Sequence, residues 1–287
     1  MQKVNIKSFC KINLSLRVLK KLPNGFHDIN SLITFCDLYD VISINKIKGL
    51  KDKIIFSGKF NKGIDVKSNT VTKVLYLLRK KNYIKKQAFK INIKKNIPHG
   101  SGLGGGSSNA ATLLNYFNLK MPLKLRKNEL YSIAKQIGSD VPICLEKRNT
   151  FLIAEGKKIL RLNKKFNLNI LIVFPNIISS TKRIYSSTKT FGYYRSKLKH
   201  NFNTKNQLIN FLKNEKNDLE RSVINFYPKI KGIINFIKIQ KGCLFSRITG
   251  SGSACIGIFS NMKAANYTQK LIKFNFPKYW CVVSKTI

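Results

Sequence analysis

A glycine-dense segment, residues 98–111, has the composition that most directly indicates chemistry. It reads Pro-His-Gly-Ser-Gly-Leu-Gly-Gly-Gly-Ser-Ser-Asn-Ala-Ala, with five glycines in the seven positions 100–106. Glycine permits positive φ and lets backbone N–H groups approach an anion without a Cβ in the way. The helix expected from Ser107 adds unpaired N–H groups and the positive end of its dipole. These features together predict a phosphate-binding loop.

We expect Ser107 to cap this helix as well, but capping does not call for so many glycines. A dinucleotide-binding loop is less favoured. Gly100, Gly102 and Gly105 fit G-x-G-x-x-G, yet residues 124–127 are Lys-Leu-Arg-Lys where a dinucleotide-binding fold needs a ribose-binding carboxylate. A Walker A loop is excluded, because no Gly-Lys-Ser or Gly-Lys-Thr follows the glycines.

The hydrophobic pattern places the loop between a strand and a helix in an α+β arrangement. A second unit is expected from about residue 160, with a variable polar connection over 189–217 and a helical stretch that Pro228 interrupts. The strands expected are 4–18, 42–47, 54–56, 89–93, 170–174, 280–283 and a strand–loop–strand over 245–259, and the helices are 71–79, 107–117, 130–137, 219–239 and 264–273.

The charge balance first suggests a nucleic-acid partner, because 54 Lys and Arg face 12 Asp and Glu for a net charge of +42. The chain is 43% hydrophobic, which excludes a disordered basic tail. Its surplus is mostly Lys and is spread along the chain, without a nucleic-acid-binding motif. Biased surface composition therefore explains the charge at least as well.

The remaining sequence features favour a soluble protein of a reducing cytoplasm. The N-terminal residues lack an apolar core of signal-peptide length, and no apolar stretch is long enough to span a bilayer. Six cysteines are scattered without a C-x-x-C pair, and neither they nor the three histidines have zinc-site spacing. We therefore expect no membrane association, no resident metal and no disulfides.

The full glycine-loop pattern, P-x-G-x-G-L-G-G-G-S-S-N-A-A, resembles the ATP loop of the GHMP kinases. Within that family it is most similar to the branch that acts on 4-diphosphocytidyl-2-C-methyl-D-erythritol. Other segments resemble the same branch in the same order along almost the whole chain. They are Lys11-Ile12-Asn13-Leu14, Gly25-Phe26-His27, Gly138-Ser139-Asp140-Val141-Pro142 and Thr249-Gly250-Ser251-Gly252-Ser253-Ala254-Cys255.

This resemblance implies a two-domain fold, with a ribosomal S5 domain 2-like ATP-binding domain over 1–160 and a ferredoxin-like domain over 161–287. It implies transfer of the ATP γ-phosphate to the 2-hydroxyl of the substrate in non-mevalonate isoprenoid biosynthesis, with Mg²⁺ carried by the nucleotide. The expected partners are ATP and this small molecule, with no specific nucleic acid, for a monomer or homodimer.

The resemblance makes Asp140 and Lys11 the catalytic candidates. Asp140 would deprotonate the acceptor hydroxyl, and Lys11 would favour the alkoxide and steady the transferring phosphoryl group. The alternative for Asp140 is an N-cap for the turn near Pro142. The alternative for Lys11 is an exposed strand lysine.

Substrate recognition is assigned by the same resemblance. An aromatic face can stack on cytosine and a histidine can hydrogen-bond its edge, which suits Phe26, His27 and Tyr185. The family usually has Tyr at position 26, so a hydroxyl contact is lost here. The alternative for each aromatic is ordinary packing. The full set of substrate candidates is Asn13, Phe26, His27, Thr181, Tyr185, Gly250, Ser251 and Gly252.

The ATP-binding candidates are the loop itself and two residues that align with positions near the adenosine. Within the loop we expect the side chains of His99 and Ser101 to be incidental. Gly250 to Ser253 resembles a second glycine loop that lies against the substrate diphosphate, and the alternative for it is a tight hairpin of small residues. The full set of ATP candidates is Pro98, His99, Gly100, Ser101, Gly102, Leu103, Gly104, Gly105, Gly106, Ser107, Ser108, Asn69 and Lys95.

Two other functions remain open at this point. One is a GHMP kinase that acts on mevalonate-type or sugar alcohols, which the residues proposed to bind cytosine disfavour. The other is a basic nucleic-acid-binding protein, which the charge supports and the motifs do not.

Overall fold

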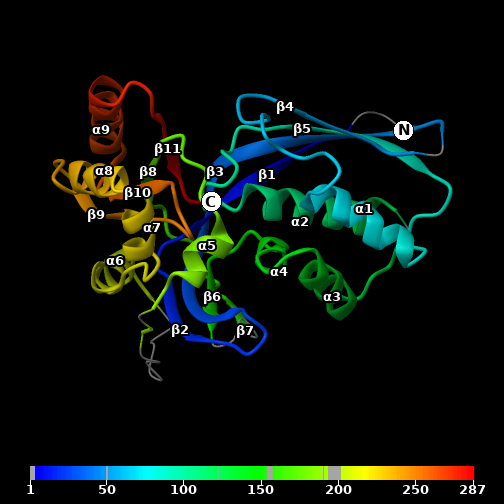
Figure 1. Ribbon diagram of the computed structural model, residues 1–287, viewed down its shortest axis with the longest axis horizontal. Helices are drawn as coiled ribbons and strands as arrows, with labels where there is room; N and C mark the ends of the chain where they lie inside the picture. Colours follow the sequence, from blue (N-terminus) through cyan, green and yellow to red (C-terminus); the bar gives the residue numbers. More distant parts are fainter. Residues whose placement is uncertain (1–3, 50, 122, 154–157, 190, 193–201) are drawn as a thin grey trace. The chain divides into compact units, whose positions relative to one another are not determined.

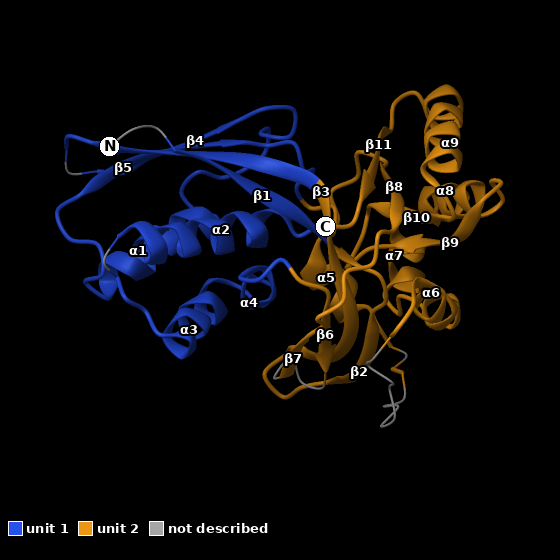
Figure 2. Ribbon diagram, turned by 180° about the vertical axis from the view of Figure 1, so that it is seen from behind, with its two compact units in different colours: residues 1–11, 38–99, 104–147 blue, residues 12–37, 100–103, 148–287 orange. Residues whose placement is uncertain are grey.

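The computed structural model describes residues 4–49, 51–121, 123–153, 158–189, 191–192 and 202–287 (Figure 1). The chain forms two compact units that are not continuous in sequence (Figure 2). Unit 1 comprises residues 1–11, 38–99 and 104–147, and unit 2 comprises 12–37, 100–103 and 148–287. The domains expected from the sequence, 1–160 and 161–287, stay a prediction.

Unit 1 combines strands with a layer of helices. Strand β5 pairs in parallel with β4 and antiparallel with residues 41–47 of β3, and β1 also pairs with β3. Helices α1 and α2 lie along one side of these strands (Figure 2). The elements are β1 (Val4–Asn13), β3 (His27–Ile47), β4 (Lys53–Ser57), β5 (Ala88–Lys94), α1 (Thr70–Lys80), α2 (Gly105–Lys120), α3 (Lys127–Ile137) and α4 (Val141–Cys144), and β1 and β3 contribute residues to both units.

The core of unit 1 follows from the helical spacing of its apolar residues. In α1 the buried positions Val71, Val74, Leu75 and Leu78 repeat every three or four residues, so they form one stripe. Helix α2 is buried over most of its length, and its Phe117 ring packs edge-on against Phe89 of β5 at 4.9 Å between centroids. This packing anchors α2, which begins where the glycine loop ends, against β5.

Unit 2 is built around an antiparallel sheet in the order β11-β8-β10-β9. Residues 27–33 of β3 pair with β2 and β6, and β6 pairs with β7. The elements are β2 (Arg17–Lys21), β6 (Thr150–Ile153), β7 (Lys158–Arg161), β8 (Asn169–Phe174), β9 (Cys243–Ile248), β10 (Cys255–Phe259), β11 (Trp280–Lys285), α5 (Thr181–Ser186), α6 (Lys205–Asn214), α7 (Glu220–Phe226), α8 (Lys229–Lys238) and α9 (Met262–Asn275).

The unit 2 core lies where α8 and α9 pack on the four-stranded sheet. Strand β10 is buried at every position, as its continuous apolar sequence requires. Helix α8 presents Ile230, Ile233, Ile234 and Ile237 as its buried stripe. No helix within the described ranges is both long and apolar enough to cross a membrane.

Most expected elements are confirmed, including the interruption at Pro228, which separates α7 from α8. Strand β3 is far longer than the predicted 42–47, because residues 30–36 are all buried and so lack the alternation that marks a half-exposed strand. Strands β6 and β7 were not predicted. Helix α6 lies within the predicted variable connection 189–217, of which residues 190 and 193–201 are outside the described residues.

The close approach of α8 to β10 generates a stability prediction. A methyl group at Gly257 would overlap the Ile237 side chain and lie 2.9 Å from Phe259 Cε2. We expect Gly257→Ala to lower the free energy of unfolding by about 1–3 kcal/mol through overpacking, measured by urea denaturation. Gly232→Ala is the matched control, since Gly232 lies in α8 with open space around it, and alanine there should add about 1 kcal/mol. Equal stabilities of the two variants would contradict this packing.

Candidate active site

The start of helix α2 has the backbone geometry expected of a phosphate site. Gly104 is the N-cap residue, in the left-handed conformation with φ of 66°, and no side chain caps the helix. The capping prediction for Ser107 is wrong, because the helix begins at Gly105 and Ser107 is its third residue. The first N–H groups of a helix lack intrahelical acceptors, so this terminus can receive an anion.

Lys11 and Asp140 form an ion pair in unit 1, beside this glycine turn. Lys11 Nζ lies 2.9 Å from Asp140 Oδ2, and the Lys11 side chain is almost fully buried whereas that of Asp140 is 36% exposed. Asp140 precedes α4 but makes no capping hydrogen bond. A Cβ at Gly104 would lie 2.7 Å from Lys11 Cε, so the missing side chain at Gly104 leaves room for the lysine. The pair therefore places a carboxylate, which can accept a proton, next to a cation.

In unit 2, residues 100–103 pack against a second glycine segment, residues 249–254. Ser179 N donates to Gly100 O at 2.8 Å, and Ala254 N donates to Ser101 O at 2.9 Å. Gly102 has φ of 82°, and a Cβ there would overlap Thr249 O and lie 3.0 Å from Gly252 N. Residue 102 must therefore lack a side chain at this contact.

Asn217, which the sequence analysis did not identify, holds the second glycine segment. Its Nδ2 donates to Gly250 O at 2.8 Å and to Ile248 O at 3.2 Å from a buried position. Thr249 Oγ1 accepts a hydrogen bond from Asn13 N at 2.9 Å. The Asn217 side chain and the Asn13 backbone thus both hold the segment. No local sequence motif indicates the position of Asn217.

The polar substrate candidates of unit 2 are partly engaged by one another. Ser251 Oγ lies 2.9 Å from Thr181 Oγ1, so these two predicted residues are brought together. Asn13 is buried, and its Nδ2 donates to Ser31 Oγ at 2.8 Å. These contacts hold the hydroxyl and amide groups in fixed positions.

The predicted aromatic residues are only partly assembled. The His27 ring lies 5.1 Å from that of Tyr185 and 6.3 Å from that of Phe191, measured between centroids. Phe26 is 65% exposed. The cluster is therefore His27, Tyr185 and Phe191. Phe191 was missed because a single aromatic residue in a polar stretch has no recognisable pattern.

The two adenosine candidates are held by protein contacts in unit 1. Asn69 is the N-cap of α1, where its Oδ1 accepts from Val71 N at 2.9 Å and from Thr72 N at 3.0 Å. Lys95 is buried and its ammonium is paired with Asp40. The expectation for His99 is that its side chain is incidental, and its Nε2 lies 2.8 Å from Lys62 O.

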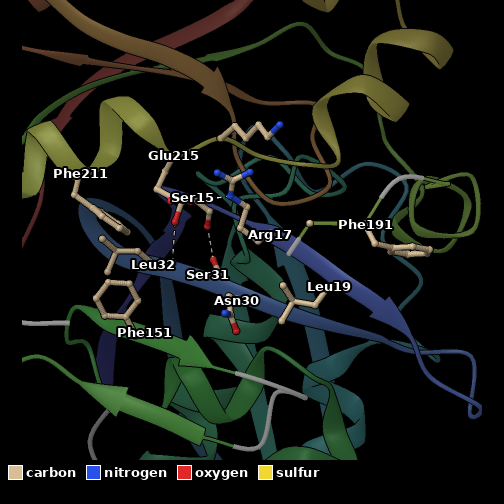
Figure 3. Close-up of a pocket in the computed structure, with 12 residues that line it drawn as sticks. Ser15, Arg17, Leu19, Asn30, Ser31, Leu32, Phe151, Phe191, Phe211 and Glu215 are labelled. Atoms are coloured by element: carbon tan, nitrogen blue, oxygen red, sulfur yellow. Dashed lines mark hydrogen bonds and ion pairs between the residues drawn. The ribbon is translucent and has the colours of Figure 1, made fainter. Parts of the chain in front are cut away.

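A cavity of about 270 Å³ in unit 2 is lined by none of the predicted site residues (Figure 3). Figure 3 shows Phe151 and Phe211 on one side and Phe191 on the other, with Arg17 bound to Glu215. Its lining residue Ser31 holds the Asn13 side chain. The cavity therefore shares Phe191 with the aromatic cluster and is linked to Asn13 through Ser31.

The surroundings of His27 predict its titration. Burial lowers the pKa of His27 below its usual 6.5, and the nearby Lys21 lowers it further. In an NMR titration of ring protons, assigned with His27→Gln, we expect a midpoint below 6.5, and a partial return toward 6.5 in Lys21→Gln. The unfolded chain binds this proton more readily, so the contribution of His27 to stability is complete above pH 6.5 and decreases as the pH falls through the lowered pKa. A midpoint at or above 6.5 would contradict this environment.

Known proteins with similar sequences and structures indicate the same kind of protein as the fold and the site do. The family model for the GHMP kinases N terminal domain matches residues 69–148, and that for the GHMP kinases C terminal domain matches residues 195–278. A crystal structure of 4-(cytidine 5'-diphospho)-2C-methyl-D-erythritol kinase superposes with a TM-score of 0.76 at 21% identity, covering 99% of both chains. The two-domain α+β GHMP kinase fold expected from the sequence is confirmed.

Two relatives extend this agreement along the sequence. The 4-diphosphocytidyl-2-C-methyl-D-erythritol kinase of Pelagibacter ubique is 39% identical over 290 residues, covering all of both chains. The enzyme of the same name from Caldicellulosiruptor saccharolyticus is 34% identical over 280 residues, covering 93% of each. Similarity of this extent shows that the chain belongs to the GHMP kinases, in the family of the 4-diphosphocytidyl-2-C-methyl-D-erythritol kinases.

Proposed function

We propose that the chain transfers the γ-phosphate of ATP to the 2-hydroxyl of 4-diphosphocytidyl-2-C-methyl-D-erythritol, giving the 2-phosphate and ADP. The observation that carries the proposal is the Lys11–Asp140 pair beside the Gly104 turn. A carboxylate, a buried cation and an uncapped helix terminus are the groups that phosphoryl transfer to an alcohol needs. The names of the relatives support this acceptor.

Asp140 acts as the base in this proposal. Its carboxylate takes the proton of the acceptor hydroxyl while the oxygen forms a bond to the γ-phosphorus and the bond from that phosphorus to ADP breaks. Lys11, which is paired with Asp140, stabilises the negative charge that develops on the acceptor oxygen. Because Lys11 is almost fully buried, its charge is little screened by water.

The nucleotide is held by the backbone at the start of α2 and by the glycine loop. The helix terminus has no side-chain cap, so its N–H groups are suited to the phosphates. The Mg²⁺ is carried by the nucleotide, where it neutralises phosphate charge. Within the described ranges no group of three or more His, Cys, Asp or Glu side chains could hold a metal ion. We retain Asn69 and Lys95 as residues near the adenosine.

The diphosphocytidyl substrate is recognised by residues of unit 2. The His27, Tyr185 and Phe191 cluster supplies the aromatic surface for cytosine, and the lowered pKa of His27 keeps its ring neutral near pH 7. Phe26 is exposed and can add a second ring face when the substrate binds.

The polar part of the substrate is assigned to the remaining candidates. Asn13 and Thr181 bind the polyol, and the segment Gly250 to Gly252, with Ser251, binds the diphosphate. The Thr181–Ser251 contact at 2.9 Å supports a shared role for these hydroxyls. We place the reaction in a reducing cytoplasm, because the six cysteines are scattered along the chain without a C-x-x-C pair. A monomer or homodimer remains our expectation.

A substrate panel tests the proposed activity. Purified protein with ATP and Mg²⁺ should form ADP in the presence of 4-diphosphocytidyl-2-C-methyl-D-erythritol, and the product should carry phosphate at the 2-position by ³¹P NMR. Mevalonate and sugar alcohols should give no ADP above background. ADP formation with one of those alcohols instead would replace the proposed acceptor.

Removal of the base tests the mechanism. We expect Asp140→Asn to lower kcat by about 10²–10⁴-fold, because proton abstraction by a positioned carboxylate contributes that much, with KM for both substrates within a few-fold of wild type. Asp37→Asn removes an exposed carboxylate and should leave kcat unchanged. A loss of only a few-fold in Asp140→Asn would remove Asp140 from the role of base.

A further inference from the structure

Asp40 is a fully buried carboxylate that the mechanism does not use. It lies in β3, is 0% exposed, and accepts hydrogen bonds from four groups within the described residues. Two are backbone groups, Asn96 N at 2.7 Å and Ile97 N at 2.9 Å. A buried carboxylate so fully satisfied is held in one position and holds its donors in turn.

The donors to Asp40 lie on both flanks of the glycine loop. Asn96 and Ile97 follow β5 and lead directly into Pro98, the first residue of the loop. Asn109 is in the second turn of α2, just after the loop, and its Nδ2 donates to Asp40 Oδ2 at 3.0 Å. Asp40 therefore connects the chain before the loop to the helix after it.

The charge of Lys95 makes this connection necessary. The Lys95 ammonium is paired with Asp40, and a Cβ at Gly105 would lie 3.2 Å from Lys95 Nζ. The cation is thus buried against the first residue of α2, the positive end of the helix dipole. Without a carboxylate this arrangement would be unfavourable, so Asp40 offsets both positive charges.

We propose that Asp40, together with Asn109, is a positioning residue that fixes the phosphate-binding conformation of the glycine loop. The inference rests on the proposed function, because it assumes that the start of α2 binds the nucleotide phosphates. In this role both residues act through the protein and not by contact with the nucleotide. Asn109 carries the connection to the helix, and its Oδ1 is buried without a partner among the described residues, so its one hydrogen bond to Asp40 is its main anchor.

The nucleotide affinity of the Asn109→Ala variant tests this role. Asp40→Ala is unsuitable, because that variant would leave Lys95 buried without its carboxylate and would prevent folding. Asn109→Ala removes one hydrogen bond and leaves the ion pair and both backbone bonds. We expect the Kd for Mg·ADP, measured by isothermal titration calorimetry, to rise about tenfold, the effect of one hydrogen bond to a charged group. Amide hydrogen exchange over residues 104–108 should become faster.

Asn115→Ala is the matched control. Asn115 lies in the same helix, and its Nδ2 donates to Leu145 O at 2.9 Å, away from the loop. This variant should lose a similar amount of thermal stability and keep the wild-type Kd for Mg·ADP. In kinase assays the KM for ATP should rise only in Asn109→Ala, and the KM for the acceptor should stay unchanged in both.

The outcomes separate this inference from the proposed function. An unchanged Kd in Asn109→Ala, or an equal rise in Asn115→Ala, would overturn the positioning role while wild-type binding supports the loop as the nucleotide site. Wild-type protein that binds no Mg·ADP would overturn both. Normal Mg·ADP binding with the predicted difference between variants supports the inference even if the acceptor proves to be another alcohol.

Discussion

Buried cations in this chain have few carboxylates with which to pair, and this constraint accounts for much of the structure. A charge removed from water is costly unless an opposite charge and hydrogen bonds satisfy it. With 12 acidic residues against 54 basic ones, the carboxylates at buried sites determine which cations can be buried. The buried or partly buried pairs of the described residues include Lys11 with Asp140, Lys95 with Asp40, Arg79 with Asp52, and Arg17 with Glu215 and Asp218.

The same constraint changes the meaning of the net charge of +42. When acidic residues are used in internal pairs, fewer carboxylates remain for the exposed lysines, and the positive surplus accumulates at the surface. Such a surplus attracts anions in general, including ATP and a diphosphate, without a specific site. The geometry that we propose to select a phosphate is instead that of the uncapped start of α2 and the buried Lys11. The charge therefore affects encounter with anions more than recognition.

The sequence predicted the site best where a motif keeps neighbouring residues together. The glycine loop, Lys11 and Asp140 lie in motifs, and the structure places the last two in an ion pair. Asp40 could not be found this way, because its partners Lys95 and Asn109 are 55 and 69 residues away and no spacing rule links them. The early start of β3 was missed for a related reason, since burial on both faces removes the alternation from which strands are predicted.

The glycine loop also shows that a high glycine content can serve close packing within the protein. Most of its glycines are required by neighbouring protein atoms, which would collide with a side chain. Those neighbours are Ile178 at Gly100, Thr249 and Gly252 at Gly102, Lys11 at Gly104, and Ile97 and Lys95 at Gly105. Gly106 alone among the five has only ordinary contact, 3.4 Å from Thr70 Oγ1. The dense glycines thus let the loop pack closely within its own protein, and this packing holds the N–H groups of α2 ready for an anion.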